Sequence, residues 1–200
     1  MEAPEPAFIG LTGAIGSGKS ETLSALARLG AATLSTDEVA HSALADPEVL
    51  PQLVERWGPE VELAGTVDRK RVGEIVFGDR DELRWLESLT HPKVAQKVVE
   101  WRQSLGPNAE LAVVEVPLLF EAGMEGFFDG VLVVVAGDRR NDWLEARGDA
   151  GVAGRSGRQL SEKEKADRAT WVVANDGTLA DLEVKLRQLW PSLLAARGRT

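Results

Sequence analysis

The chain reads Gly13-Ala14-Ile15-Gly16-Ser17-Gly18-Lys19-Ser20 between a short apolar run, 7–11, and a segment of helical periodicity, 19–29. This is the pattern G-x-x-x-x-G-K-[ST], in which a glycine-rich turn points successive backbone N–H groups into one concavity. The helix that begins near Lys19 adds the positive end of its dipole. Lys19 can then reach the β- and γ-phosphates of a nucleotide, and the Ser20 hydroxyl can hold Mg²⁺. The pattern predicts a nucleotide phosphate site, and a glycine-rich turn with an exposed lysine is the less favoured interpretation.

On either side of this motif, short apolar runs alternate with segments of helical periodicity. The runs that we expect to form strands are 7–11, 31–34, 111–116, 131–136 and 170–174. The segments that we expect to form helices are 19–29, 37–45, 139–147, 160–168 and 179–189. Such alternation indicates a parallel sheet with helices on both faces. We therefore predict an α/β protein of the three-layer P-loop type with a five-stranded parallel sheet.

Two segments depart from this alternation. Residues 47–106 show apolar positions at helical spacing with no clear strand, which predicts a helical insert. Residues 148–157 are rich in glycine and poor in large apolar side chains, so we expect them to be mobile. Most of the six tryptophans are expected to be core residues of the insert and of the last helix.

The composition excludes several classes of protein. There are 23 Lys and Arg against 32 Asp and Glu, a net charge of −9, which argues against a protein that coats duplex DNA. The absence of cysteine excludes disulfides and thiolate metal sites, and two histidines cannot form a three-histidine site. No apolar stretch approaches the roughly 18 residues of a membrane span, and the acidic start of the chain is unlike a signal peptide. We expect a soluble, cytoplasmic protein.

Asp37 is the next carboxylate after the motif at a predicted strand end, in Leu34-Ser35-Thr36-Asp37. The carboxyl ends of parallel strands converge on the ligand crevice, where a carboxylate can accept a proton from an attacking hydroxyl group. Asp is also a common residue at the start of a helix. The spacing alone leaves both roles open for Asp37.

The sequence resembles the dephospho-coenzyme A kinases, beginning with Leu11-Thr12 and the motif that follows. The resemblance continues in order along nearly the whole chain. Its further elements are Asp37, Thr90-His91-Pro92, Val116-Pro117-Leu118-Leu119-Phe120-Glu121, the series Arg155, Gln159 and Lys165, and Asn175-Asp176-Gly177.

This resemblance implies transfer of the ATP γ-phosphoryl group to the ribose 3′-hydroxyl group of dephospho-CoA, with Mg²⁺, as the last step of coenzyme A synthesis. It implies one domain, 1–200, with a helical substrate-binding insert, 47–106, and a mobile lid, 138–165. It favours Asp37 as the general base, and it implies that Lys19 and Arg147 are also catalytic residues. Arg147 and Arg155 would approach the triphosphate from the lid, although a helix-terminal residue and a solvated loop charge are the alternatives.

The resemblance also implies contacts with the two substrates. His91 would face dephospho-CoA, whereas the residues alone favour an ordinary helix start at His91-Pro92. The side chains that follow the third predicted strand would pack on adenine or the pantetheine arm, or in the core, and Asn175 would close on adenine or cap a turn. The residues implied on the substrate side after this strand are Pro117, Leu118 and Leu119. Glu115, near the end of the same strand, would orient water bound to Mg²⁺.

Some positions differ from the family pattern. Glu21 stands where a Thr often contacts the α-phosphate, His41 where an Arg is usual on the substrate side, and Trp143 where a lid arginine is common. The competing interpretations are another small-molecule P-loop kinase and a nucleotide-dependent switch without an acceptor. A guanine-reading Asn-Lys-x-Asp segment, typical of small GTPases, is absent from the sequence.

Overall fold

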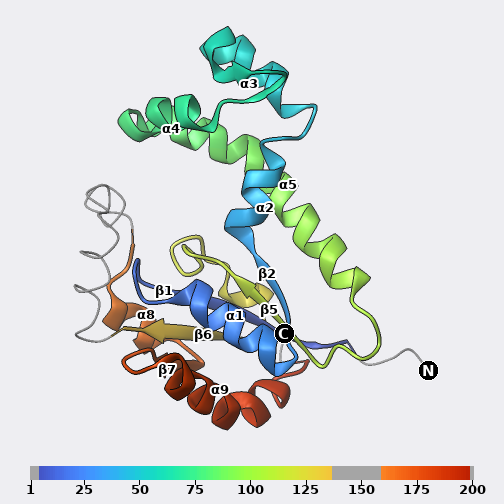
Figure 1. The fold of residues 1–200 in the computed structure, drawn as a ribbon, viewed down its shortest axis with the longest axis vertical. Coiled ribbons are helices and arrows are strands. Elements are labelled where there is room, and N and C mark those ends of the chain that lie inside the picture. The colour runs from blue at the N-terminus through green and yellow to red at the C-terminus, as the bar shows by residue number, and fades with distance from the viewer. Residues whose placement is uncertain (1–4, 137–158, 199–200) are drawn as a thin grey trace. The chain divides into compact units, whose positions relative to one another are not determined.

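The computed structural model describes residues 5–136 and 159–198 (Figure 1). Five strands form one sheet in the order β2-β5-β1-β6-β7, and every neighbouring pair is parallel. The strands are β1 (Ala7–Gly13), β2 (Ala32–Ser35), β5 (Leu111–Glu115), β6 (Gly130–Val135) and β7 (Trp171–Ala174). The predicted five-stranded parallel sheet is confirmed.

The strand register brings the carboxyl ends of the strands to one edge of the sheet. Glu115 at the end of β5 lies opposite Leu11 of β1 on one side and Ser35 of β2 on the other. Gly13, at the end of β1, pairs with Val134 of β6. Chain segments that leave these strands therefore start from the same edge, which is where open parallel sheets bind their ligands.

One face of the sheet is covered by α1 (Lys19–Leu29) and α9 (Leu179–Leu194). Alternate residues of β1 point toward these helices, as the period of a strand requires. The core on this side contains Ala7, Ile9, Leu11, Leu26, Leu111, Val113, Leu132, Val134, Leu182 and Leu186.

The opposite face is covered by the chain that follows β5 and by α8 (Glu162–Arg168), which packs against β6. Phe128, which follows the short helix η2 (Glu125–Phe127), stacks on Phe8 with ring centroids 5.0 Å apart. A Cβ atom at Gly10 would come within 2.5 Å of the Leu119 side chain, so the small residue of β1 admits Leu119 to this core. Helices thus lie on both faces of the sheet, as the sequence predicts.

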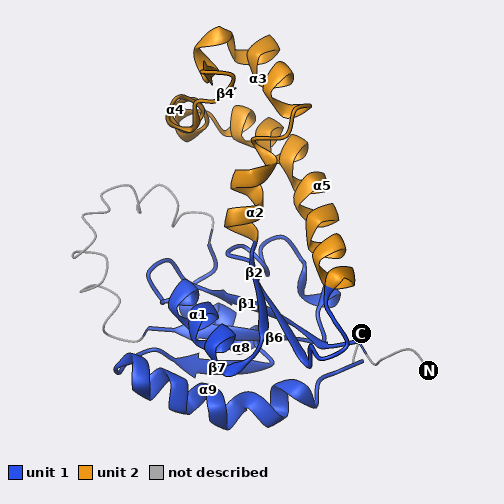
Figure 2. Ribbon diagram, turned by 45° about the vertical axis from the view of Figure 1, so that its right-hand side comes forward, with its two compact units in different colours: residues 1–35, 105–200 blue, residues 36–104 orange. Residues whose placement is uncertain are grey.

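Residues Thr36–Ser104 form a second compact unit, and Met1–Ser35 with Leu105–Thr200 forms the first (Figure 2). The elements of the second unit are α2 (Thr36–Ala43), α3 (Val49–Trp57), η1 (Pro59–Val61), β3 (Glu62–Leu63), β4 (Thr66–Val67), α4 (Arg69–Gly78) and α5 (Arg80–Ser104). Its core is separate and contains Val49, Leu53, Val61 and Val72.

The second unit differs from the sequence expectation in three respects. It begins at Thr36 rather than at Pro47, so Asp37 belongs to it. The expectation of an insert without strands is wrong, because β3 and β4 pair in an antiparallel hairpin. The helix start proposed at His91-Pro92 is also wrong: both residues lie inside α5, which already begins at Arg80.

The helix expected at 139–147, the glycine-rich segment 148–157 and most of the expected lid lie outside the described residues. Within the described ranges, no helix has both the length and the apolar character needed to cross a membrane.

Candidate active site

The loop between β1 and α1 is a turn built on glycines. Gly16 and Gly18 have φ angles of 79° and 86°, in the left-handed region that L side chains rarely adopt. A Cβ atom at Gly13 would come within 2.5 Å of the Val134 carbonyl oxygen. Within the described part of the chain, no side chain caps the start of α1, so its first N–H groups face outward at the positive end of the helix.

Lys19 lies with its charge on this loop. Its Nζ atom donates to the carbonyl oxygen of Ala14 at 3.0 Å and to that of Gly13 at 3.2 Å. The ammonium group is therefore held over the turn that the glycines form. The glycine turn and the Lys19 ammonium group of the motif therefore lie together, and anion binding by the loop stays a prediction.

Ser20, in the first turn of α1, is exposed and lies beside Glu115 at the end of β5. The Ser20 hydroxyl donates to Glu115 Oε1 at 3.5 Å, and Glu115 itself is 4% exposed. The pair places a hydroxyl oxygen and a carboxylate oxygen at the same strand edge. Oxygen atoms of these two kinds are the ligands that Mg²⁺ prefers.

Asn175 approaches the loop from the end of β7. Its Nδ2 atom donates to the Ser17 carbonyl oxygen at 3.2 Å and to Glu21 Oε2 at 3.3 Å. Glu21 stands where the family often has a threonine that contacts the α-phosphate. In this structure its carboxylate accepts a hydrogen bond from Asn175. Both residues lie against the loop, and the interaction of either with a nucleotide stays a prediction.

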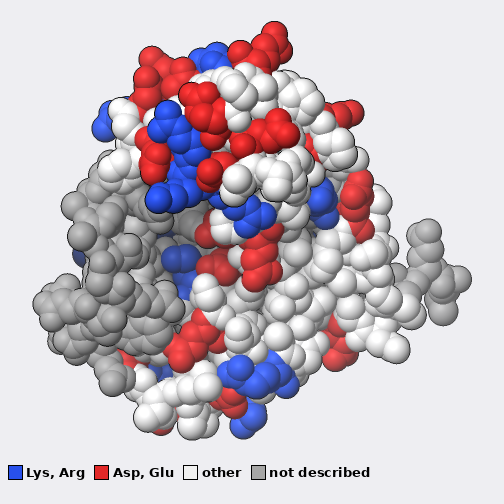
Figure 3. Space-filling model, turned by 45° about the horizontal axis from the view of Figure 1, so that its top comes forward, with Lys and Arg blue, Asp and Glu red and all other residues white. Residues whose placement is uncertain are grey.

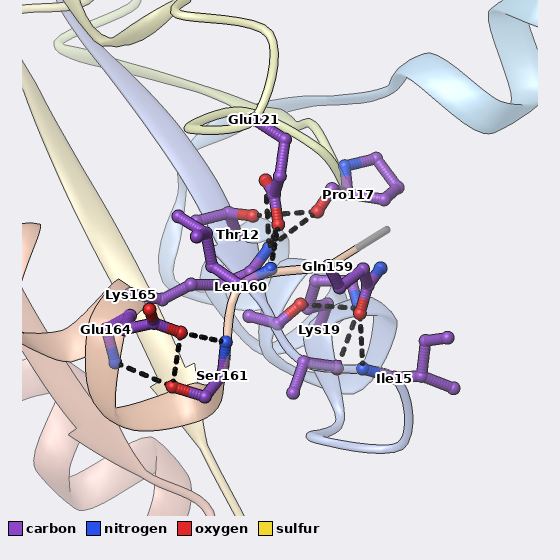
Figure 4. A network of polar contacts seen from close by, with 12 residues as sticks. Thr12, Ile15, Lys19, Pro117, Glu121, Gln159, Leu160, Ser161, Glu164 and Lys165 are labelled. Carbon is purple, nitrogen blue, oxygen red and sulfur yellow. Dashed lines mark hydrogen bonds and ion pairs between the residues drawn. The ribbon is translucent and has the colours of Figure 1, made fainter. Parts of the chain in front are cut away.

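Gln159 approaches the same loop from the segment before α8, as Figure 4 shows. Its Oε1 atom accepts a hydrogen bond from the Ile15 N–H group at 3.2 Å. Farther along, Lys165 Nζ donates to the Pro117 carbonyl oxygen at 2.9 Å and forms an ion pair with Glu121 at 3.0 Å. The sequence suggested Gln159 and Lys165 only as parts of a family pattern and gave neither of them a partner.

Lys165 is fully buried, although the rest of α8 is strongly charged. Burial lowers the pKa of its ammonium group from the ordinary value, and the hydrogen bond and charge of Glu121 act in the opposite direction. Lysine is almost never fully buried unless it is paired. From the sequence, the burial of Lys165 could be expected only from its position in the helix, because Lys165 lies on the inner face of α8.

Three predicted site residues belong to the second unit. Asp37 is the second residue of α2 and is exposed, and it follows the carboxyl end of β2 by two positions in the chain. His41 lies in the last turn of α2 with an exposed side chain, and its carbonyl oxygen accepts from Arg69 at 3.1 Å. His91 is exposed in the middle of α5.

The side chains after β5 were expected either to pack on a substrate or to pack in the core, and they differ in burial. Leu119 is 0% exposed and packs against Gly10, which favours the core interpretation for this side chain. Pro117 and Leu118 are half-buried, so their side chains are partly accessible. Arg147, Arg155 and Trp143 lie outside the described residues, and their expected roles stay predictions.

The charged side chains of the described residues show no dedicated metal cage. No group of three or more His, Cys, Asp or Glu side chains could hold a metal ion there. On the face shown in Figure 3, Lys and Arg side chains are interspersed with Asp and Glu side chains. A metal ion at Ser20 and Glu115 would therefore need further ligands, and nucleotide phosphates supply them in many sites of this type.

A parallel sheet with a glycine loop between its first strand and first helix defines the P-loop nucleotide-binding proteins, and Lys19 and Ser20 complete their sequence motif. The model of the dephospho-CoA kinase family matches residues 7–181. A dephospho-CoA kinase of Thermus thermophilus is 38% identical over 196 residues, which cover 96% of this chain and 94% of that protein. One from Chlorobaculum tepidum is 35% identical and covers 97% and 98% of the two chains.

Solved structures agree with this relationship. The crystal structure of TT1252 from Thermus thermophilus has a TM-score of 0.78 and 37% identity, and covers 94% of this chain and 98% of that one. Dephospho-CoA kinase from Campylobacter jejuni has a TM-score of 0.64 and 25% identity, with coverage of 92% and 96%. The chain belongs to the dephospho-CoA kinase family and is an ATP-dependent kinase.

Proposed function

We propose that this chain phosphorylates the ribose 3′-hydroxyl group of dephospho-CoA on the loop Gly13–Ser20, with Asp37 as the general base. The observation that carries the proposal is the loop itself, where left-handed glycines, an uncapped helix start and the Lys19 ammonium group face the same space. Phosphoryl transfer depends mostly on positioning and on neutralising charge, and these groups supply both.

In the proposed reaction, the 3′-oxygen attacks the γ-phosphorus of ATP while its proton passes to the Asp37 carboxylate. The bond between the γ-phosphorus and the bridging oxygen breaks, and ADP leaves with that oxygen. The loop N–H groups and Lys19 would hold the β- and γ-phosphates through the transfer. Asp37 is exposed and follows the end of β2 by two positions in the chain, so its carboxylate is accessible to solvent.

Mg²⁺ fits the residues present, because Ser20 and Glu115 offer a hydroxyl and a carboxylate oxygen 3.5 Å apart at this edge. Ser20 and Glu115 would hold the ion, which would supply positive charge to offset that of the phosphates. The proton transfer itself remains between the ribose hydroxyl group and Asp37 in this proposal.

The other predicted contacts complete the proposal. His41, His91, Pro117 and Leu118 would contact dephospho-CoA. Asn175 would contact the adenine of ATP, Glu21 would lie at the α-phosphate, and Arg147 and Arg155 would contact the triphosphate. The cytoplasmic location and the absence of a nucleic-acid partner, which the composition favours, stay predictions.

The test is ADP release by the purified protein with ATP, Mg²⁺ and dephospho-CoA, run beside adenosine, AMP and no acceptor. We expect turnover only with dephospho-CoA, and coenzyme A as the product by mass spectrometry. Turnover with AMP or adenosine alone would assign a different acceptor. Slow ADP release that is independent of every acceptor would instead indicate a nucleotide-dependent switch.

A further inference from the structure

Lys165 differs from its neighbour Lys163 on the same helix. The Lys163 side chain is 83% exposed and pairs with Asp167, whereas Lys165 is 0% exposed. Lys165 reaches two acceptors, the Pro117 carbonyl oxygen at 2.9 Å and the Glu121 carboxylate at 3.0 Å. Both acceptors lie in the chain segment that follows β5, so the buried charge ties α8 to that segment.

The Glu121 carboxylate has a second partner. Its Oε1 atom accepts a hydrogen bond from the Leu160 N–H group at 2.8 Å, immediately before the helix cap at Ser161. One carboxylate thus joins the Lys165 ammonium group and the backbone that precedes α8. This fixes the position of Leu160 and, through the chain, of the residue before it.

That preceding residue is Gln159, which contacts the phosphate loop. Its Oε1 atom accepts a hydrogen bond from the Ile15 N–H group at 3.2 Å. A second connection is shorter: the Pro117 carbonyl oxygen that accepts from Lys165 also accepts from Thr12 Oγ1 at 3.2 Å, at the end of β1. Figure 4 shows one connection reaching Thr12 at the end of β1 and the other reaching Ile15 in the loop that precedes Lys19.

Stability alone is a weak reason for a charge at this position. Desolvating an ammonium group has a large cost, and apolar residues of similar volume often replace a buried ion pair without loss of stability. An apolar side chain, however, would leave the Pro117 carbonyl oxygen without the Lys165 donor and would not hold Glu121 against Leu160. The two hydrogen-bonded connections require a cation with several donors at this place.

We propose that Lys165 is a positioning residue for phosphoryl transfer, which acts through Glu121 and Gln159 on the phosphate loop at Ile15 without touching ATP. The proposal rests on the function proposed above. It predicts that loss of the Lys165 charge changes the handling of ATP and leaves the handling of dephospho-CoA unchanged.

The first experiment compares Lys165→Met with Lys163→Met, its control on the same helix, by steady-state kinetics and by calorimetric measurement of the ATP Kd. We expect Lys165→Met to raise the KM and Kd for ATP about tenfold, with the KM for dephospho-CoA unchanged. Lys163→Met should match the wild type. Equal ATP constants in the two folded variants would overturn the proposal, as would a fall in kcat alone.

Two further variants separate positioning from folding and test the route. The double variant Glu121→Gln with Lys165→Met removes both buried charges, so it should unfold near the wild-type temperature and still show the raised ATP constants. Gln159→Met should raise the same constants, and adding Lys165→Met to it should increase them little further, because both changes break the connection to Ile15 and only the Pro117 connection to Thr12 is lost in addition. Multiplication of the two effects would contradict the route through Gln159.

The wild-type control separates this proposal from the proposed function. If the wild type shows no turnover with dephospho-CoA, the proposed function fails. The ATP Kd values then still decide whether Lys165 positions the loop.

Discussion

Lys19 supplies the positive side chain of the phosphate loop, and its Nζ atom is placed by the Gly13 and Ala14 carbonyl oxygens. Lys19→Ala should weaken ATP binding and lower turnover by about 10²–10³-fold, because the charge would stabilise the transferring phosphoryl group more than the bound substrate. Calorimetry with ATP and ADP release measure the two effects. Lys163→Ala, on the surface of α8, serves as the control, and an unchanged ATP affinity and rate in Lys19→Ala would remove the assignment of the loop.

Asp37 is predicted to accept the proton of the attacking hydroxyl group. Asp37→Asn keeps the size of the side chain and removes its basicity, so turnover should fall by roughly 10²–10⁴-fold while the ATP Kd stays the same. The matched control is Glu38→Gln, because Glu38 is the next residue of α2 and is likewise exposed. Near-normal turnover in Asp37→Asn would show that another group takes the proton.

For single residues, the sequence predicts those contacts whose partners are close together in the chain. The loop and Lys19 follow from eight consecutive residues, and in the structure the loop has left-handed glycines with the Lys19 ammonium group on it. The partner of Lys165 is Glu121, 44 positions earlier in the chain, and the pairing depends on how α8 packs. No short pattern contains that information, so the buried pair could not be predicted from the residues alone.

The helices α3 and α5 are joined by a group of polar and aromatic side chains around Glu82. Arg56 donates to both carboxylate oxygens of Glu82, and Trp57 Nε1 donates to Oε2 at 2.6 Å. The Trp57 and Trp85 rings meet edge to face, 5.0 Å apart, and the Arg56 guanidinium group lies 4.6 Å from the Trp85 centroid. The hydrogen bonds from Arg56, and then that from Trp57, lower the pKa of Glu82 below its ordinary value of 4.5.

This lowered pKa makes the contribution of Glu82 to stability depend on pH. The folded state binds the Glu82 proton less readily than the unfolded state, so the stabilisation is present above the unfolded pKa and is lost as pH falls through the folded pKa. Glu82→Gln should therefore be less stable than the wild type at pH 7, and the difference should shrink as pH falls below 4.5. The difference in the free energy of unfolding is measured by urea denaturation, monitored by circular dichroism, at a series of pH values.

Glu100→Gln is the control for this prediction, since Glu100 is exposed on the same helix and accepts a hydrogen bond from Gln96. It should differ from the wild type much less than Glu82→Gln does at pH 7. A Glu82→Gln difference that stays constant between pH 7 and pH 3 would contradict the assignment of the effect to carboxylate ionisation.

The elements that the sequence missed are those whose local signals are weak. Each strand of the β3–β4 hairpin has only two residues, too few for an alternation of apolar and polar side chains to be visible. Pro92 commonly marks a first turn, yet it lies inside α5, a helix of 25 residues. The packing of Trp85, Leu86 and Leu89 against the core of this unit helps to explain why tertiary contacts prevail over the local signal.

For the whole molecule, the alternation of apolar runs with helical segments was enough to predict the five-stranded sheet, because its buried strands are nearly continuous apolar runs. The boundary of the second unit was not predictable in the same way. The chain leaves the sheet at Ser35, opposite Glu115, and returns to it at Leu111, so the second unit occupies one crossover between parallel neighbours. Only the pairing of β2 with β5 reveals that Asp37 begins this crossover.

The two units have separate cores, which leads to a prediction about the whole chain. Among the described residues, the core between the sheet and the helices α1 and α9 comes from 1–35 and 105–200, and the core around Val49, Leu53, Val61 and Val72 comes from 36–104. Replacing residues 36–104 by a flexible linker should therefore leave a folded α/β protein with an intact phosphate loop. Ser35 and Leu111 are offset by the length of β5, roughly 13 Å at about 3.3 Å per residue. Residues 105–110 remain before Leu111, so a linker of about eight Gly and Ser residues between Ser35 and Leu105 is long enough for this offset.

We expect this shortened chain to unfold cooperatively and to bind ATP with nearly the Kd of the full chain, but to transfer no phosphoryl group to dephospho-CoA. It lacks Asp37, His41 and His91, the residues proposed for proton transfer and acceptor binding, whereas the loop, Lys19, Ser20 and Glu115 all remain. Urea denaturation, calorimetry and ADP release measure the three properties, with full-length Asp37→Asn as the control for lost chemistry. Residual transfer above that control would place the base in the α/β unit, and loss of cooperative unfolding would show that the α/β core depends on the crossover for its stability.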